Sequence, residues 1–406
     1  MSTFEQLVPG TYHYFKKFAM LDEMDLRIVH KMAEGCPEGP RNVRKIAKDL
    51  KLPQQTVNYR ILRIDSKDLV RFRAVPNENL LGLKNYSVIA TTKPGLLYET
   101  DKGDAVNAGT FLTCYPIWRS TKEIVGSNIH GFFVQYAIPH EKERDLKLFL
   151  RKLEKVKCIS RIDDFCEVTQ TLFNKPSLDL HLSMRKALGR QHHISFKWEE
   201  WINDFAKAKE AVLPKEKISE KVVLFSYTDL QILSCLEENL RMKFVEIAKR
   251  MGEPNSKIPR WFKEIIRSKL ISDCRAEICA TNPKTSMHLV VRIEFSNDTA
   301  LGKFISHLDR IPYSVSYQQV IQQSVIFLYI AIPPHEYLSF RNVFDALNRK
   351  HDIIRDYSLY VSNYVARWDN IKLYETFSKT EKKWEFSFEV IDEVFEKLRS
   401  ANNFQF

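Results

Sequence analysis

The chain lacks the signals of a membrane-spanning or exported protein. It has no apolar run of about 18 or more residues, the length that a membrane-spanning helix needs. Its N-terminus does not show the charged and then apolar segments of a signal peptide. We therefore expect a cytoplasmic, nucleoid-associated protein without a membrane partner.

Motifs of several enzyme classes are absent as well. There is no P-loop, no glycine-rich dinucleotide fingerprint, no GxSxG and no HExxH. The cysteines form no CxxC pair, and none has a histidine at zinc-ligand spacing. They are Cys36, Cys114, Cys158, Cys166, Cys235, Cys274 and Cys279. We expect reduced, mostly buried thiols, no catalytic residue, no metal and no cofactor, and we predict that the protein is not an enzyme.

Positive charge is in excess and is spread along the chain. The 406 residues include 62 Lys and Arg against 51 Asp and Glu, a net charge of +11. Such an excess favours a polyanionic partner. The length predicts about two to four domains, and 44% hydrophobic residues are enough to form their cores.

Residues 42–76 combine two short amphipathic helices with a basic strand pair. Apolar residues recur at helical spacing on both sides of a turn at Leu52 and Pro53. The two stripes are Val43, Ile46, Ala47 and Leu50, and then Val57, Ile61 and Ile64. This layout is typical of a helix-turn-helix, whose second helix enters the DNA major groove. The alternative is a helix pair with a solvated basic face.

The polar residues of this stretch have the chemistry of DNA contacts. Amide side chains can bind adenine in a bidentate manner, and arginine can bind guanine or phosphate. We predict base contacts by Gln54, Gln55, Asn58 and Tyr59, phosphate contacts by Arg60, Arg63, Arg71 and Arg73, and a further DNA contact by Arg44. Arg71 and Arg73 lie on the cationic side of an alternating strand, which would be the wing.

An upstream segment completes a three-helix core. Residues 21–32 begin with acids, which suit a helix N-terminus, and carry an apolar stripe. At this point the chain resembles the Lrp/AsnC family of transcription regulators. The resemblance rests on Leu21-Asp22, Asp25, Ile28, Ile46-Ala47, Thr56-Val57, Tyr59-Arg60-Ile61, Leu69-Val70 and Leu80-Leu81-Gly82-Leu83. It implies a winged helix-turn-helix and double-stranded DNA as the partner.

The chain then repeats itself. Residues 225–278 line up with the first unit: Asp25 matches Asp229 at an offset of 204, and Ile46 matches Ile247 at an offset of 201. The difference falls in a Gly- and Pro-rich loop at residues 35–40 of the first copy.

The second recognition helix differs from the first. We predict that Ser256 caps its N-terminus, which would place Pro259 in the first turn, where proline is tolerated. Its DNA-binding residues would be Ser256, Lys257, Arg260, Lys263 and Arg267, mainly on the phosphate backbone. Two unlike helices imply an asymmetric DNA site.

After each wing the pattern reads strand, helix, strand, strand, helix, strand, a ferredoxin-like βαββαβ order. In the resembling family this is the dimerisation and effector domain. We therefore predict an α+β fold, a tandem repeat of a winged helix-turn-helix followed by a ferredoxin-like domain. The segments are an N-terminal extension (1–20), the first winged helix-turn-helix (21–76) and ferredoxin-like domain (77–175), a packing helix and linker (176–222), the second winged helix-turn-helix (223–280) and ferredoxin-like domain (281–366), and a C-terminal helix (367–406).

The predicted function is sequence-specific transcription regulation, by an intramolecular pseudo-dimer or by a homodimer of two-repeat chains. The family's small-molecule effector site uses a turn that residues 126–131 and 322–324 do not reproduce, so plain hairpin turns are the alternative there. Two other functions stay open. One is a protein-interaction scaffold, and the other is an enzyme like the sirohaem decarboxylases, with a tetrapyrrole site drawn from His130, His140, His288 and His335.

Overall fold

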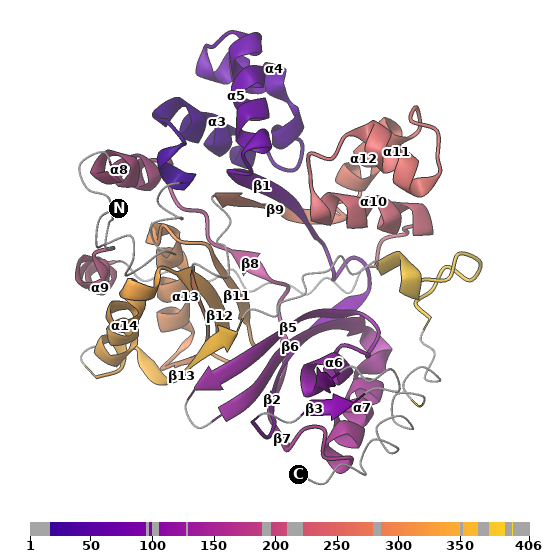
Figure 1. The fold of residues 1–406 in the computed structure, drawn as a ribbon, viewed down its shortest axis with the longest axis vertical. Helices are drawn as coiled ribbons and strands as arrows, with labels where there is room; N and C mark the ends of the chain where they lie inside the picture. The colour runs from indigo at the N-terminus through magenta and orange to yellow at the C-terminus, as the bar shows by residue number, and fades with distance from the viewer. Residues whose placement is uncertain are drawn as a thin grey trace. The chain divides into compact units, whose positions relative to one another are not determined.

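The computed structural model is a mixed α+β structure with antiparallel sheets (Figure 1). It describes residues 17–94, 97–99, 105–126, 129–188, 196–208, 222–278, 286–349, 352–363, 373–385 and 392. They divide into two compact units. The first unit draws on Met1–Pro76, Thr171–Lys217 and Cys235–Leu359, and the second on Asn77–Gln170, Ile218–Ser234 and Tyr360–Phe406. Within the described ranges, no helix has the length and apolarity needed to cross a bilayer.

Two sets of three helices and one strand occur in the chain. The first set is α3 (Glu23–Glu34), α4 (Val43–Leu50), α5 (Gln54–Ser66) and β1 (Val70–Pro76). The second set is α10 (Tyr227–Glu238), α11 (Phe244–Met251), α12 (Ile258–Arg267) and β9 (Ile271–Ile278). Asp22 and Asp25 form a capping box at the start of α3, which satisfies backbone donors that a helix N-terminus leaves free.

The two sets have the same internal geometry. The buried residues of α5 are Val57, Ile61 and Ile64, and those of α12 are Ile258, Phe262 and Ile265. Each pair, such as 57 and 258, is separated by 201 residues. The left-handed residues after the helices, Lys51 and Asp68 in the first set and Gly252 and Lys269 in the second, keep the same separation. The offset of 201 residues found in the sequence therefore also relates the buried residues of α5 and α12 and the left-handed residues of the turns.

The strands that follow the two sets pair with each other. β1 and β9 form a two-stranded antiparallel sheet, in which Val70 lies opposite Ile278 and Ala74 lies opposite Cys274. We expected a basic strand pair within the first set, with its arginines on DNA. That expectation is wrong, because the partner strand of β1 comes from the second set. The two sets are thereby joined through backbone hydrogen bonds.

A disulfide joins the same two sets. Cys36, which follows α3, is bonded to Cys274 of β9, with a Cα–Cα distance of 6.0 Å. The prediction that all cysteines are reduced is therefore wrong. The two residues are 238 positions apart in the chain, and the pairing of β1 with β9 places Cys274 near the first set. Among the described residues, Cys114, Cys158, Cys166 and Cys235 take no part in a disulfide.

The first unit contains a sheet with the strand order β13-β10-β12-β11-β8. Its elements are β8 (Leu172–Phe173), β10 (Met287–Phe295), α13 (Asp298–His307), β11 (Val315–Gln319), β12 (Val325–Ile332), α14 (Tyr337–Arg349) and β13 (Ile354–Asn363), of which the last residues belong to the second unit. Helices α13 and α14 pack on one face through Leu289, Val291 and their neighbours. The last strand predicted for the first ferredoxin-like domain (77–175) is interrupted, and its final residues form β8, which pairs with β11.

The second unit contains a sheet with the order β7-β2-β6-β5, next to which residues 361–363 of β13 pair with β5. Its elements are β2 (Leu83–Thr91), α6 (Ala108–Leu112), β5 (Trp118–Gly126), β6 (Ile129–Pro139), α7 (Glu143–Lys155) and β7 (Arg161–Val168). The helix predicted somewhere within residues 101–114 is only the short α6. A small hairpin, β3 (Leu97–Glu99) with β4 (Ala105–Asn107), precedes it.

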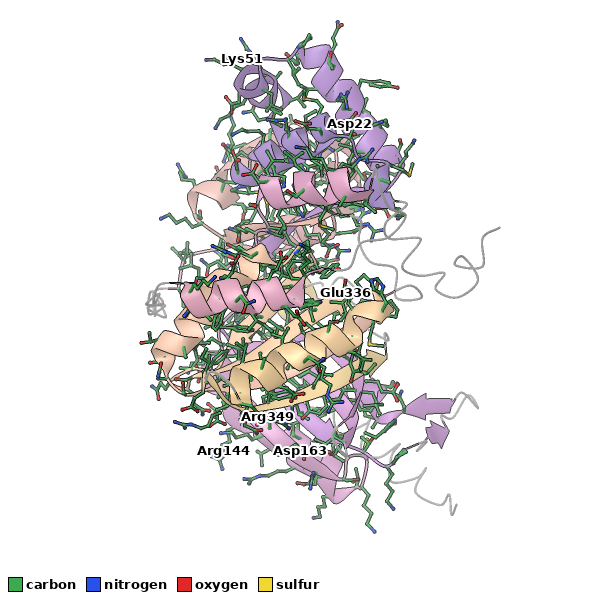
Figure 2. All side chains as sticks on the ribbon, turned by 90° about the vertical axis from the view of Figure 1, so that its left-hand side faces the viewer. Asp22, Lys51, Arg144, Asp163, Glu336 and Arg349 are labelled. Atoms are coloured by element: carbon green, nitrogen blue, oxygen red, sulfur yellow. A yellow bond between two sulfur atoms is a disulfide. The ribbon has the colours of Figure 1, made fainter. Side chains whose placement is uncertain are left out.

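Two further helices belong to the first unit. α9 (Trp198–Lys207) begins inside a Lys-Trp-Glu triplet, residues 197–199, which recurs at residues 383–385, and packs on α13 and α14. Glu336 (Figure 2), only 1% exposed, accepts hydrogen bonds from the Trp198 indole and the Phe196 backbone, both at 2.6 Å. The second triplet lies beside an isolated bridge between Phe377 and Trp384. The predicted linker lies outside the described residues. So do most of the predicted C-terminal helix and most of the N-terminal extension.

Helix α8 (Leu178–Leu188), which the sequence analysis missed, packs on α3. His181 is buried on α8, and its Nδ1 lies 2.9 Å from Nε2 of His30 on α3. Burial, reinforced by the nearby His30, lowers the pKa of His181 to about 4, and burial also lowers the pKa of His30. Both imidazoles are therefore neutral in the folded protein at neutral pH.

This histidine pair predicts acid sensitivity. In the unfolded chain His181 binds a proton below pH 6.5. In the folded protein it binds one only when the pH falls to about 4. The free energy of unfolding is therefore unaffected by this residue above pH 6.5. It decreases by about 3 kcal/mol as the pH falls from 6.5 toward 4. Urea unfolding of wild type and His181→Gln at several pH values should show a shallower acid loss in the variant. Parallel curves would contradict this prediction.

Candidate nucleic-acid interface

The predicted base-contacting residues lie on the solvent side of α5. Val57, Ile61 and Ile64 fix one face of the helix in the core. The opposite face carries Gln54, Gln55, Asn58 and Tyr59, all exposed. Pro53 precedes α5 in an extended conformation, and left-handed Lys51 ends α4, which produces the tight turn between the two helices. Arg44 is exposed on α4.

Arg60 and Arg63 do not point to a DNA surface. Arg60 Nη1 lies 2.6 Å from Asp22 Oδ2 and 2.9 Å from Asp25 Oδ1, and Arg63 also forms an ion pair with Asp25. Partial burial alone would raise the pKa of Asp22, but the hydrogen bond from Arg60 holds it below its usual value. Both guanidinium groups thus hold the start of α3 against α5, and phosphate contacts by these arginines stay a prediction.

The wing arginines are also engaged within the protein. Arg71 forms a hydrogen-bonded ion pair with Asp68 at 2.6 Å, and Arg73 lies 3.6 Å from Glu277 of the paired strand β9. Arg73 is thus a contact between β1 and β9. Phosphate contacts by Arg71 and Arg73 stay a prediction, and any such contact would come from the sheet that β1 forms with β9.

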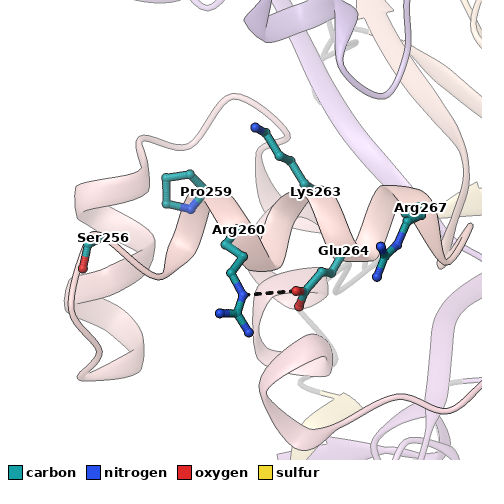
Figure 3. A pocket seen from close by; sticks show the side chains of 6 residues that line it. All are labelled: Ser256, Pro259, Arg260, Lys263, Glu264 and Arg267. Atoms are coloured by element: carbon teal, nitrogen blue, oxygen red, sulfur yellow. Dashed lines mark hydrogen bonds and ion pairs between the residues drawn. The ribbon is translucent and has the colours of Figure 1, made fainter.

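Helix α12 presents a cationic surface (Figure 3). Ser256, Pro259, Arg260, Lys263, Glu264 and Arg267 line a hollow of about 460 Å³. Arg260 pairs with Glu264 at 3.2 Å and Lys257 with Glu253 at 3.0 Å, but such exposed pairs contribute little to stability. In the described part of the chain, Lys263 and Arg267 form no ion pair. Pro259 lies in the first turn as predicted, although the N-cap residue is Lys257 and not Ser256.

Two arginines that the sequence analysis overlooked connect the helical sets. Arg41 donates to the Met242 carbonyl at 2.7 Å, and its guanidinium lies 4.5 Å from the Phe244 ring centroid. Burial, together with the charge of Arg241, lowers the pKa of Arg41 to about 10. Arg241 forms a bidentate pair with Asp65 at 2.6 Å. No spacing pattern marks these residues, since their partners are far away in the sequence.

The four histidines considered for a tetrapyrrole site belong to different units. His130 and His140 lie in the second unit, where His130 Nε2 is 3.2 Å from Glu123. His288 and His335 lie in the first unit, where His288 Nδ1 hydrogen-bonds to the Tyr329 hydroxyl and His335 is 3.5 Å from Glu336. Among the described residues, no three His, Cys, Asp or Glu side chains could together hold a metal ion.

No family model and no curated protein matches this chain. Among solved structures, sirohaem decarboxylase NirDL in complex with an iron-uroporphyrin III analogue is 12% identical, with a TM-score of 0.49, and the match covers 94% of this chain and 100% of that one. A second NirDL structure is 11% identical, with a TM-score of 0.47, covering 96% and 100%. AsnC of E. coli is 16% identical, with a TM-score of 0.26, covering 34% and 92%.

One prediction is corrected by these comparisons. The two matches that extend over nearly the whole chain are structures of an enzyme, which overturns the prediction that this protein is not an enzyme. The match to AsnC is confined to about a third of the chain.

The ion-pair cluster at α3 predicts a large effect of one substitution. Asp25 is fully buried, so Asp25→Ala leaves two partly buried guanidinium groups without this carboxylate. We expect a loss of about 3 kcal/mol in the free energy of unfolding, measured by urea denaturation. Asp49→Ala, at an exposed position of α4, is the control and should change stability by less than about 0.5 kcal/mol. Equal effects of the two substitutions would contradict the prediction.

Proposed function

We propose that this protein is a DNA-binding transcription regulator of Lrp/AsnC type. In this proposal each helical set is a winged helix-turn-helix, each sheet with its helices is a ferredoxin-like domain, and one chain contains the two halves of a pseudo-dimer. α5 and α12 are the recognition helices.

A comparison of equivalent surface positions carries the proposal. Five exposed positions of α5 have counterparts 201 residues later, on or beside α12. In the first copy they are Gln55, Thr56, Tyr59, Leu62 and Ser66, and in the second they are Ser256, Lys257, Arg260, Lys263 and Arg267. At these five positions the first copy carries no charge, whereas the second carries four cations.

These two surfaces suit the two parts of a DNA duplex. Uncharged hydrogen-bonding side chains discriminate base edges in the major groove, while lysine and arginine neutralise phosphates irrespective of sequence. We therefore assign base recognition to α5 and backbone binding to α12. Because β1 pairs with β9, both helices act on one DNA molecule from a single block of the first unit.

Salt-dependent binding tests this proposal. The logarithm of the affinity falls with the logarithm of the salt concentration by about 0.9 per phosphate contact. We expect Arg267→Ala to reduce this slope by about 0.9 in fluorescence-anisotropy titrations of genomic and random duplexes. Arg349→Ala, an exposed cation on α14 (Figure 2), removes the same charge and should not change the slope. Equal slopes for wild type and Arg267→Ala, or absent DNA binding, would refute the proposal.

A second candidate function is supported by one face of the sheet in the first unit. On the side opposite to α13 and α14, His288 hydrogen-bonds to Tyr329, and Gln318 and Arg292 lie across Phe327 on neighbouring strands. His288, Phe327 and Gln318 are each less than 5% exposed. Imidazole can bind iron and guanidinium can pair with carboxylates, so His288 and Arg292 have the chemistry to hold an iron tetrapyrrole, which could bind only if this buried face opened.

Spectroscopic titration separates this candidate from the first. If the face binds an iron tetrapyrrole through His288, adding iron-uroporphyrin III should shift its visible absorption bands in wild type. The shift should be lost in His288→Gln and kept in His130→Gln, a control in the second unit. An unchanged spectrum in wild type, or the same shift in all three proteins, would exclude this candidate.

A further inference from the structure

Two apolar side chains on α5 remain without a role in the fold. Tyr59 is 69% exposed and Leu62 is 56% exposed. They lie three residues apart, and therefore next to each other on the helix surface. Gln55 and Asn58 are exposed on the same helix, one turn earlier. The recognition surface thus combines amide groups with an apolar patch.

The core does not require this patch. Val57, Ile61 and Ile64 already fill the buried side of α5. The counterparts of Tyr59 and Leu62 in the second copy are Arg260 and Lys263, which fold on the same scaffold. Exposure of a leucine forgoes the free energy that burial would supply, so the patch is explained better by an external contact than by the packing of this unit.

The charges around Tyr59 and Leu62 indicate which kind of molecule binds this apolar patch. Arg44, Lys48, Lys51 and Lys67 are exposed on and beside α4 and α5, and they outnumber the exposed acids Asp49 and Asp65 of the same helices. A second copy of this surface would bring like charges together. Duplex DNA complements the cationic border with phosphates and offers an apolar group inside its major groove, the 5-methyl group of thymine.

We propose, on the basis of the proposed DNA-binding function, that Tyr59 and Leu62 recognise thymine methyl groups and that Asn58 recognises a neighbouring adenine. Among the four bases only thymine presents a methyl group in the major groove, and an amide side chain matches adenine N6 and N7. α12 carries cations at the equivalent positions, so sequence preference comes from α5. The preferred DNA is a duplex in which a segment that contains A·T pairs lies beside a segment of any sequence.

Deoxyuridine substitution tests this inference. A duplex that binds tightly is selected from random sequences with the full-length chain, and its thymines are then replaced in turn by deoxyuridine, which removes only the methyl group. At the contacted positions we expect about fourfold weaker binding per methyl in anisotropy titrations, the loss that one buried carbon implies. Leu62→Ala should bind the original duplex more weakly and lose this sensitivity. Leu338→Ala, at a leucine 67% exposed on α14, should keep it.

The outcomes distinguish this inference from the function on which it rests. Salt-dependent DNA binding with no effect of deoxyuridine at any position would overturn methyl recognition and leave DNA binding intact. Equal sensitivity of wild type and Leu62→Ala would also overturn it, because the methyl effect would then arise elsewhere. If Leu62→Ala changed the sedimentation coefficient but not the deoxyuridine effect, a second copy would be the occupant. Absence of binding to any duplex would refute the DNA-binding function itself.

Discussion

The antiparallel pairing of β1 with β9 is the interaction on which the arrangement of the two helical sets depends. It places Cys274 opposite Ala74 and within reach of Cys36, so that a disulfide can form between segments 238 residues apart. It also brings Arg73 to Glu277. Arg41 on Phe244 and Arg241 with Asp65 add polar and aromatic contacts between the same two sets. The strands that would form two separate wings instead form one shared sheet.

The two helical sets that this sheet joins differ in their internal contacts. In the first copy, Asp25 binds Arg60 and Arg63, and these ion pairs stabilise the helix packing. In the second copy, Trp261 and Glu264 occupy the equivalent positions, and Asp229 accepts hydrogen bonds from Ser226 instead. The sheet joins both sets, while the five compared positions are uncharged on α5 and mostly cationic on or beside α12. The proposed division between base recognition and backbone binding follows from this difference.

Local periodicity predicted much of the fold and part of the candidate site. The spacing of Val57, Ile61 and Ile64 determines which side of α5 is buried, and therefore the exposure of Gln55, Asn58 and Tyr59. Contacts between distant segments could not be predicted in this way. The acidic partners of Arg60 lie 35 and 38 residues away, and β1 pairs with a strand of the other copy, from which Glu277 approaches Arg73. A basic residue looks the same in sequence whether its partner is a phosphate or a buried carboxylate. For this reason the sequence did not indicate that Arg60, Arg63, Arg71 and Arg73 form ion pairs within the protein, whereas Lys263 and Arg267 lie on the exposed face where they were expected.

The central claim is that one chain binds one asymmetric DNA site through two unlike helices. Hydroxyl-radical footprinting on a selected duplex tests it most directly, with the sequence of each half of the footprint scrambled in turn. The account predicts two adjacent protected segments, one that disappears when its sequence is scrambled and one that persists with any sequence. Two equivalent segments related by a palindrome, or the absence of protection, would contradict it.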